Sequence, residues 1–196
     1  CADASIPFLH VSTDYVFEGS GQRPWRPEDP VSPLNAYGRS KAAGETAVRA
    51  AGGAHAILRT SWVFSATGRN FVTAMLELAQ KRDQLNVVDD QIGGPTPACA
   101  IAQALLKMAE AMIAGQGGGT YHFAGAPFVS WAGFAREIFA CSGQNVAVSG
   151  IPASAYPTTA QRPLNSRLDC TSLEADFGIQ PPDWRAKLAE VVEGLV

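Results

Sequence analysis

A hydroxyl, a phenol and an ammonium group occur close together in the first quarter of this 196-residue chain. Thr13 follows an apolar run, and Tyr37 and Lys41 come later, four residues apart. On a helix, residues with this spacing lie on one face. An ammonium held beside a phenol stabilises the phenolate and lowers the phenol pKa from its ordinary value of about 10. Such a set suits proton exchange during hydride transfer to or from a carbonyl, where a nicotinamide carries the hydride.

The Tyr-x-x-x-Lys spacing alone is weak evidence, because it arises by chance in roughly one chain in three of this length. The structural alternative is an ordinary amphipathic helix with a solvated Lys41. The context favours a site. Thr13 closes the predicted strand 8–12, and Tyr37 follows the Pro- and Asn-rich loop 27–35. Ligands of α/β proteins gather at the carboxyl ends of strands, so we expect the strand end and the helix face to meet.

The composition is that of a soluble globular protein, with 46% hydrophobic residues, 17% charged residues and a net charge of −3. This size allows one substantial core or a domain and a half. The acidic balance argues against nucleic acid, and no apolar run approaches the roughly 20 residues that span a bilayer. The four scattered cysteines suggest free thiols in a reducing cytoplasm. The three histidines lie in apolar runs, so we expect core or sheet positions and no metal site.

Strand and helix patterns alternate along the chain, which predicts an α/β protein with parallel strand pairing. The expected strands are 8–12 (buried), 56–62, 85–88, 121–123 and 146–151. The expected helices are 33–51, 70–82, 98–114, 130–141 and 184–195, and 93–97 is expected to be a turn cluster. The Gly runs end or separate these elements. None of them opens a helix with the G-x-G-x-x-G spacing that holds a dinucleotide pyrophosphate.

Several longer blocks are more specific than the Tyr/Lys pair. They are residues 11–17, 35–41 with Gly44 and Glu45, 58–64, 70–71, 90–96 and 162–166. In these blocks the chain resembles extended short-chain dehydrogenases/reductases, and more closely the dTDP-4-dehydrorhamnose reductase family, over essentially its whole length. Tyr-x-x-x-Lys is shared across that superfamily. The Ser-Thr-Asp-Tyr-Val-Phe, Arg-Thr-Ser-Trp and Asp-Gln-x-Gly-x-Pro-Thr blocks are much narrower signals.

The resemblance implies the C-terminal part of a Rossmann-type parallel-sheet domain plus a small substrate-binding domain. Residues 1–125 would be the remainder of the NAD(P)-binding domain with interleaved substrate-domain segments, and 126–196 mainly the substrate-binding domain. The implied reaction is reduction of dTDP-4-dehydro-L-rhamnose to dTDP-L-rhamnose by NADPH, with NADH as an alternative donor. The implied setting is cytoplasmic dTDP-rhamnose biosynthesis, with a homodimer as a candidate assembly and no nucleic-acid or membrane partner.

The family pattern also includes about ninety residues that would precede this chain and would contain the Gly-rich loop. We therefore expect a polypeptide limited to these 196 residues to bind NADPH weakly and to be poorly active. Carried over by position, Tyr37 would protonate the oxygen at sugar C4. Lys41 would tune Tyr37 and hold the nicotinamide ribose, so that both residues bind the cofactor. Thr13 would hydrogen-bond the reacting oxygen.

The resemblance further implies that Asp14, Tyr15 and Trp62 join Thr13 in binding the substrate, with Asp14 and Tyr15 on sugar hydroxyls. Each has a structural alternative: a turn cap for Asp14, core packing for Tyr15 and plain packing for Trp62. Asn70 is either an N-cap or a substrate contact. Arg162 either binds the diphosphate or forms a surface salt bridge.

Two alternative functions stay open. A sugar-nucleotide epimerase or dehydratase of the same superfamily would share Tyr37 and Lys41. A non-catalytic regulatory subunit, of the type of the β subunit of methionine adenosyltransferase, would keep the fold and bind a partner enzyme. The presence of Thr13 together with Tyr37 and Lys41 favours catalysis, because a pure binding module needs no tuned phenol.

Overall fold

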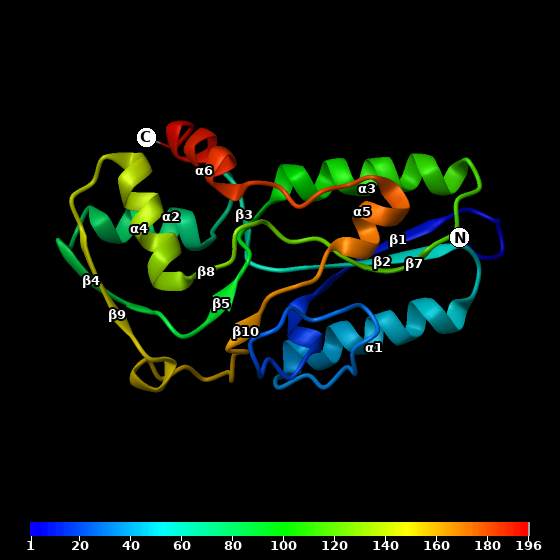
Figure 1. Ribbon diagram of the computed structural model, residues 1–196, viewed down its shortest axis with the longest axis horizontal. Helices are drawn as coiled ribbons and strands as arrows, with labels where there is room; N and C mark the ends of the chain where they lie inside the picture. Colours follow the sequence, from blue (N-terminus) through cyan, green and yellow to red (C-terminus); the bar gives the residue numbers. More distant parts are fainter. Residues whose placement is uncertain (196) are drawn as a thin grey trace.

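The central layer of the protein is a parallel three-stranded sheet. The computed structural model describes residues 1–195, and its largest parallel sheet has the strand order β1-β2-β7. Helix α1 lies against one face of this sheet, and α3 and α5 lie against the other (Figure 1). The elements are β1 (Phe8–Thr13), α1 (Ala36–Ala51), β2 (His55–Thr60), α3 (Ala98–Ile113), β7 (Gly119–His122) and α5 (Thr171–Phe177). The predicted α/β class with parallel pairing is therefore confirmed.

Contacts of the first turn of helix α1 fix its position against the segment that follows β1. Asn35 caps the helix, since its Oδ1 accepts a hydrogen bond from the Gly38 backbone N–H at 2.9 Å. Gly38 is needed because a Cβ there would overlap the carbonyl oxygen of Tyr15. That close approach presses the start of α1 against the short 3₁₀ helix η1 (Asp14–Val16), which follows β1. The helix ends at Gly52, whose φ of +69° lies in the region that favours glycine.

A second group of elements lies at the other end of the long axis (Figure 1). Its strands β4 and β9 pair in parallel, and helices pack against them around Phe134 and Trp184. The elements are α2 (Phe71–Ala79), β4 (Gln84–Val88), α4 (Trp131–Ser142), β9 (Ala147–Ile151) and α6 (Trp184–Glu193). This core and the core beside the central sheet each take residues from both sides of position 125. The predicted domain division at that position stays a prediction.

Short strands join the two groups. They are β3 (Val63–Phe64), β5 (Ile92–Gly93), β6 (Thr96–Pro97), β8 (Val129–Ser130) and β10 (Asn165–Ser166). β3 pairs with β6, and β5 lies between β10 and β8. The prediction of a simple turn cluster at 93–97 was wrong. Gly93 and Gly94 allow other segments to approach closely here, since a Cβ on Gly94 would overlap the carbonyl oxygen of Gly125.

The long predicted helices and strands are confirmed, with ends that shift by a few residues. The prediction of a buried first strand was wrong, because β1 is an edge strand in the described sheet. Phe8 is 40% exposed and Val11 38%. Helices α5 and η2 (Ala153–Ala155) were not expected from the sequence. Only Leu173 is buried in α5, so its apolar periodicity is too weak to read.

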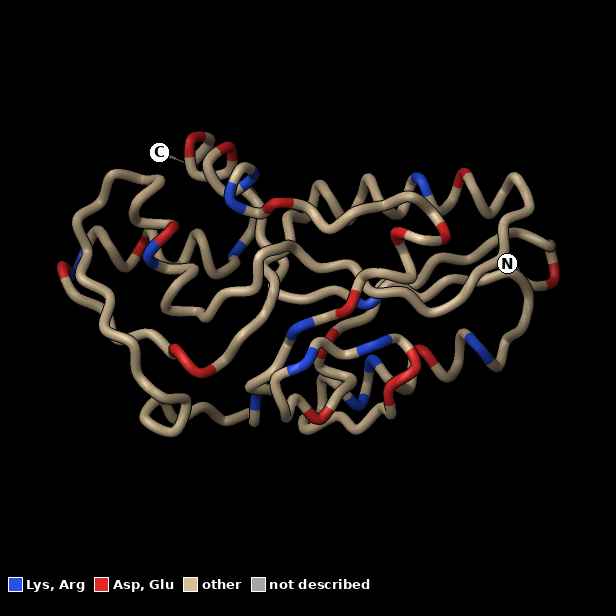
Figure 2. The backbone as a smooth tube through the Cα atoms, in the orientation of Figure 1, with Lys and Arg blue, Asp and Glu red and all other residues tan. Residues whose placement is uncertain are grey.

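The described residues also bear on membrane insertion, metal binding and cysteine pairing. Within residues 1–195, no helix is long and apolar enough to cross a bilayer, and no group of three or more His, Cys, Asp or Glu could hold a metal. The cysteines are free, with Cys170 buried and the others exposed. His122 is completely buried. Basic and acidic residues are intermixed around α1 and the loop that precedes it (Figure 2).

Candidate active site

Thr13, Tyr37 and Lys41 lie near the carboxyl end of the central sheet. Thr13 ends β1, and the strand register places it beside Thr60 at the end of β2. Lys41 reaches back from α1, and its Nζ donates to the carbonyl oxygen of Val11 at 2.6 Å. The Tyr37 ring meets the edge of the Tyr15 ring, with 5.5 Å between centroids. The fold therefore brings the three residues to the end of the sheet where β1 and β2 have their carboxyl ends.

The Asp14 carboxylate holds the hydroxyl of Thr13 by a hydrogen bond. Thr13 Oγ1 donates to Asp14 Oδ1 at 3.0 Å and accepts from the Tyr15 backbone N–H at 3.2 Å. Asp14 is only 2% exposed. Burial raises the pKa of Asp14 to about 6, although hydrogen bonds from Ser166 and Thr13 act in the opposite direction. Its Oδ2 has no hydrogen-bond partner within the described chain. Asp14 thus fixes the direction of the Thr13 hydroxyl, and its action on a sugar stays a prediction.

The two tyrosines of the site differ in exposure. Tyr37 is 55% exposed, so its hydroxyl can be reached by a ligand. Tyr15 is half-buried, and burial raises its pKa, with the Asp14 carboxylate adding to the rise. Arg162 lies close enough to Tyr15 to act in the opposite direction. The outcome is a neutral Tyr15 between Tyr37 and Arg162.

A buried ion pair holds α1 to the sheet beneath the site. Glu45 lies one turn beyond Lys41 on the same helix face, and Arg59 lies in β2. Arg59 Nε and Nη2 donate to the two Glu45 oxygens at 2.8 and 2.7 Å. Burial opposes the ionisation of Glu45 most strongly, but the hydrogen bonds and charge of Arg59, with smaller contributions from Ser12 and Arg49, together outweigh it and lower the pKa of Glu45. Arg59 Nη1 also donates to the carbonyl oxygen of Pro27 at 3.0 Å. The pair therefore ties the loop, the helix and the strand together.

Trp62 connects the end of β2 to the second group of elements. Its φ of +49° is unusual for a bulky residue. Its ring stacks on Trp131 with centroids 3.5 Å apart and planes 8° from parallel. A Cβ on Gly93 would lie 2.7 Å from Trp62 Cε2, so the ring position depends on that glycine. Such strain at a strand end is a feature of functional sites.

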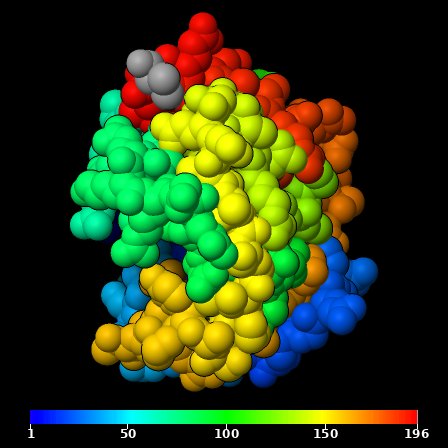
Figure 3. All heavy atoms as spheres, turned by 90° about the vertical axis from the view of Figure 1, so that its left-hand side faces the viewer, coloured from blue at the N-terminus to red at the C-terminus, as the bar shows by residue number. Residues whose placement is uncertain are grey.

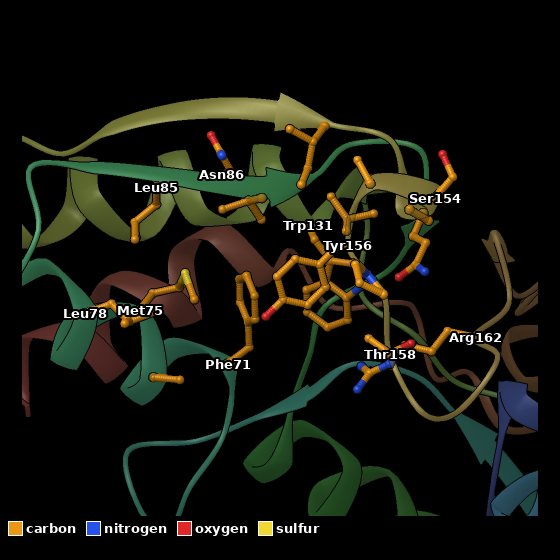
Figure 4. Close-up of a pocket in the computed structure, with 18 of the residues that line it drawn as sticks. Phe71, Met75, Leu78, Leu85, Asn86, Trp131, Ser154, Tyr156, Thr158 and Arg162 are labelled. Atoms are coloured by element: carbon orange, nitrogen blue, oxygen red, sulfur yellow. The ribbon is translucent and has the colours of Figure 1, made fainter.

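A groove of about 1770 Å³ extends from Trp131 along α2, β4 and residues 153–162. Figure 4 shows the rings of Phe71, Trp131 and Tyr156 gathered in its middle, with Arg162 at one side. The space-filling view shows a hollow between the green α2–β4 segment and the gold segment 153–162 (Figure 3). Its cations are Arg69, Arg82 and Arg162, and no acidic side chain is found among the described residues that line it. The groove suits a ligand with a flat apolar part and anionic groups.

The sequence matches a family described as the RmlD substrate binding domain, over residues 1–196. It is 44% identical to a dTDP-4-dehydrorhamnose reductase of Sinorhizobium fredii, over 100% of this chain and 68% of that protein. The chain belongs to the dTDP-4-dehydrorhamnose reductase family. The predicted family resemblance is confirmed.

Solved structures of the family agree with this assignment. A dTDP-4-dehydrorhamnose reductase from Clostridium acetobutylicum is similar with a TM-score of 0.89 and 36% identity, over 94% of this chain and 64% of that one. One from Bacillus anthracis, solved in complex with NADP, has a TM-score of 0.87 and 32% identity, over 93% and 64%. This family member therefore spans about two thirds of the length of its relatives.

The sequence did not reveal the aromatic centre of the groove. Phe71, Trp131 and Tyr156 come from three separate segments, and only tertiary packing brings them together. Asn70 was left as either an N-cap or a substrate contact. It caps α2, with Oδ1 accepting from Val72 N at 3.0 Å, and it also lines the groove. The available signal was weak: a Trp directly after the capping Ser130 and a Tyr within a Pro-rich run.

Proposed function

We propose that the complete gene product reduces dTDP-4-dehydro-L-rhamnose to dTDP-L-rhamnose with NADPH. In this proposal, residues 1–196 carry the proton donor and the sugar-nucleotide site. The observation that carries the proposal is the placement of Tyr37 and Lys41 on one face of α1, at the strand end that holds Thr13. Membership of the reductase family supports the same reaction.

Tyr37 is the proposed general acid, because its exposed side chain packs against Tyr15, just beyond the strand end where the C4 oxygen of the sugar would come. Thr13 would hold that oxygen. Its hydroxyl donates to Asp14 in the free chain, so it must turn its proton to the C4 oxygen when substrate binds. Asp14 and Tyr15 are proposed to act on sugar hydroxyls, Tyr15 from its position beside Tyr37.

The residues at this end of the sheet fit a nicotinamide nucleotide. When bound, NADPH supplies the hydride. Lys41 uses one N–H for the carbonyl oxygen of Val11, and an ammonium has three donors, so others are free for a ribose hydroxyl. Tyr37 offers its exposed hydroxyl to the same ribose. The Bacillus anthracis relative in complex with NADP supports this choice of cofactor, with NADH as the alternative.

The groove would receive the nucleotide part of the substrate. Arg162 would bind the diphosphate, since a guanidinium matches paired phosphate oxygens. The rings of Phe71, Trp131 and Tyr156 would hold the base, and Trp62 would pack against the sugar. We further propose the domain division 1–125 and 126–196, a cytoplasmic location and a homodimer.

Tyr37→Phe in the complete gene product tests the proposal. NADPH oxidation with the keto-sugar nucleotide is expected to fall at least about 100-fold, because the proton donor is lost. The Kd for NADPH, measured by fluorescence titration, should rise by no more than about fivefold, since one net hydrogen bond contributes only about 1 kcal/mol.

Tyr121→Phe is the matched control, because it removes a phenol hydroxyl that donates to Asp176 in α5, on the face of the sheet opposite α1. That variant should keep full activity. Unchanged reduction by Tyr37→Phe would remove the catalytic role. A wild-type product that epimerises or dehydrates a sugar nucleotide, or that has no activity and only binds a partner enzyme, would overturn the proposed reduction.

A further inference from the structure

One buried side chain joins the catalytic helix to the wall of the groove. Asn35 is 9% exposed, and both ends of its amide are used. Oδ1 accepts from Gly38 N at 2.9 Å and so caps α1. Nδ2 donates to the carbonyl oxygen of Gln161 at 2.8 Å. The two bonded positions are more than one hundred residues apart in the sequence, yet they share one amide group.

The wall in question is segment 153–162, which lines one side of the groove. It has a hydrogen bond to the rest of the fold at each end. Ala153 N donates to Asp90 Oδ1 at 2.8 Å at the start, and Asn35 holds the carbonyl of Gln161 at the end. Between them the side chains are mostly exposed, including Tyr156 at 56%. The placement of this segment therefore depends strongly on its two ends.

We propose that Asn35 is a positioning residue that sets the groove wall in register with Tyr37; this inference rests on the proposed function. Arg162 directly follows the held carbonyl and lies against Tyr15, whose ring meets Tyr37. A sugar nucleotide that lies along the groove must reach Arg162 and Tyr37 at once. Holding both beforehand reduces the ordering that the ligand would otherwise have to impose.

The cap alone does not require asparagine. Ser and Asp cap helices about as well as Asn, because their side-chain oxygens accept the same backbone N–H. Neither offers an amide N–H to a second segment. Aspartate would also bring a carboxylate oxygen against the carbonyl of Gln161, which is repulsive. Asn35→Ser and Asn35→Asp should therefore keep the helix cap to Gly38 N but lose the hydrogen bond to the carbonyl oxygen of Gln161.

Both variants are to be compared with wild type in the complete gene product. The KM for the keto-sugar nucleotide should rise about fivefold, which corresponds to one net hydrogen bond. The kcat should change less than KM, and the KM for NADPH should not change. Amide hydrogen exchange should become faster in segment 153–161, with exchange in the first turn of α1 unchanged. The melting temperature should fall by only a few degrees, because one hydrogen bond is lost and the cap is kept.

Asp183→Ser is the matched control, since it alters a helix cap in α6, outside the groove lining. It should change neither KM nor exchange in segment 153–161. Asn35→Ser combined with Arg162→Gln should raise KM by less than the product of the single effects, because both act through one segment.

Unchanged exchange in segment 153–161 would overturn the proposal, and so would faster exchange with an unchanged KM for the sugar nucleotide. Loss of protection in the first turn of α1 would also overturn it, by showing that only the cap matters. Failure of the wild type to oxidise NADPH with the keto-sugar would instead reject the proposed function. The exchange data would still decide whether Asn35 holds the wall.

Discussion

Asp14 is a buried acid whose Oδ2 has no hydrogen-bond partner among the described residues. Its Oδ1 accepts from Thr13, while burial raises its pKa from 3.8 to about 6. Because the folded pKa lies above the unfolded value, the folded state holds the proton more tightly. This contribution to stability is fully present below about pH 4 and is lost as the pH rises through about 6. Asp14 therefore stabilises the fold in its neutral form.

Asp14→Asn is expected to stabilise the protein relative to wild type as the pH rises from 4 to 7. The gain should be about 3 kcal/mol, the free energy that matches the pKa difference. The amide keeps an oxygen that can accept from Thr13 Oγ1. Urea unfolding of both proteins across this range gives the difference, and other titrating groups cancel in it. A pH-independent difference would show that Asp14 has an ordinary pKa in the folded state.

At the element scale, α1 must stay fixed because it carries Tyr37 and Lys41. The bidentate pair of Glu45 and Arg59 joins it to β2, with side chains 1% and 2% exposed. Removing one partner of such a pair leaves an uncompensated buried charge. The orientation of the helix that carries Tyr37 and Lys41 therefore depends on a charge pair outside the proposed reaction.

Glu45→Gln is expected to lower the free energy of unfolding by roughly 3 kcal/mol, because Arg59 then remains buried without a counter-charge. Adding Arg59→Met should recover part of this loss, since the buried charge disappears. Arg49→Gln is the control. Arg49 binds the same carboxylate but is 43% exposed, so its loss should cost less than about 1 kcal/mol. Denaturant unfolding measures all of these, and a double variant as unstable as the sum of both single variants would contradict the expectation.

The sequence predicted the long elements well and the short ones poorly. Helix α3 has buried residues at Ile101, Ala104, Met108 and Met112, a helical period that is visible without a structure. Strands of two residues have no such period. β5 and β6 exist because glycines let other segments approach, and that approach is a tertiary event. The Thr13, Tyr37 and Lys41 cluster could be expected, because a strand end and a helix face are local features of the sequence. The Asn35–Gln161 hydrogen bond could not, because it forms only when distant segments pack together.

At the scale of the whole molecule, the two groups of elements meet where the substrate is proposed to lie. The Trp62–Trp131 stack and the Asn35–Gln161 hydrogen bond both cross between the central sheet or its helix and the segments that line the groove. The chain spans 64% of each of the two family structures. The described contacts position the proposed proton donor and the groove, whereas the sequence contains no Gly-rich loop for the proposed cofactor.

A polypeptide limited to residues 1–196 is expected to bind NADPH weakly and to show negligible turnover with the keto-sugar nucleotide. The sequence contains no G-x-G-x-x-G turn to place a pyrophosphate on a helix N-terminus, so Lys41 and Tyr37 would have to hold the cofactor with little help. NADPH fluorescence titration and an oxidation assay, run beside the complete gene product, measure both expectations. Equal rates from the two proteins would contradict them.

The exposed β1 edge, with Phe8 40% exposed, should also make this polypeptide associate as its concentration rises. Phe8→Lys should reduce that association in light scattering without changing NADPH binding, because a charge on an edge strand blocks pairing and position 8 lies at the opposite end of β1 from Thr13.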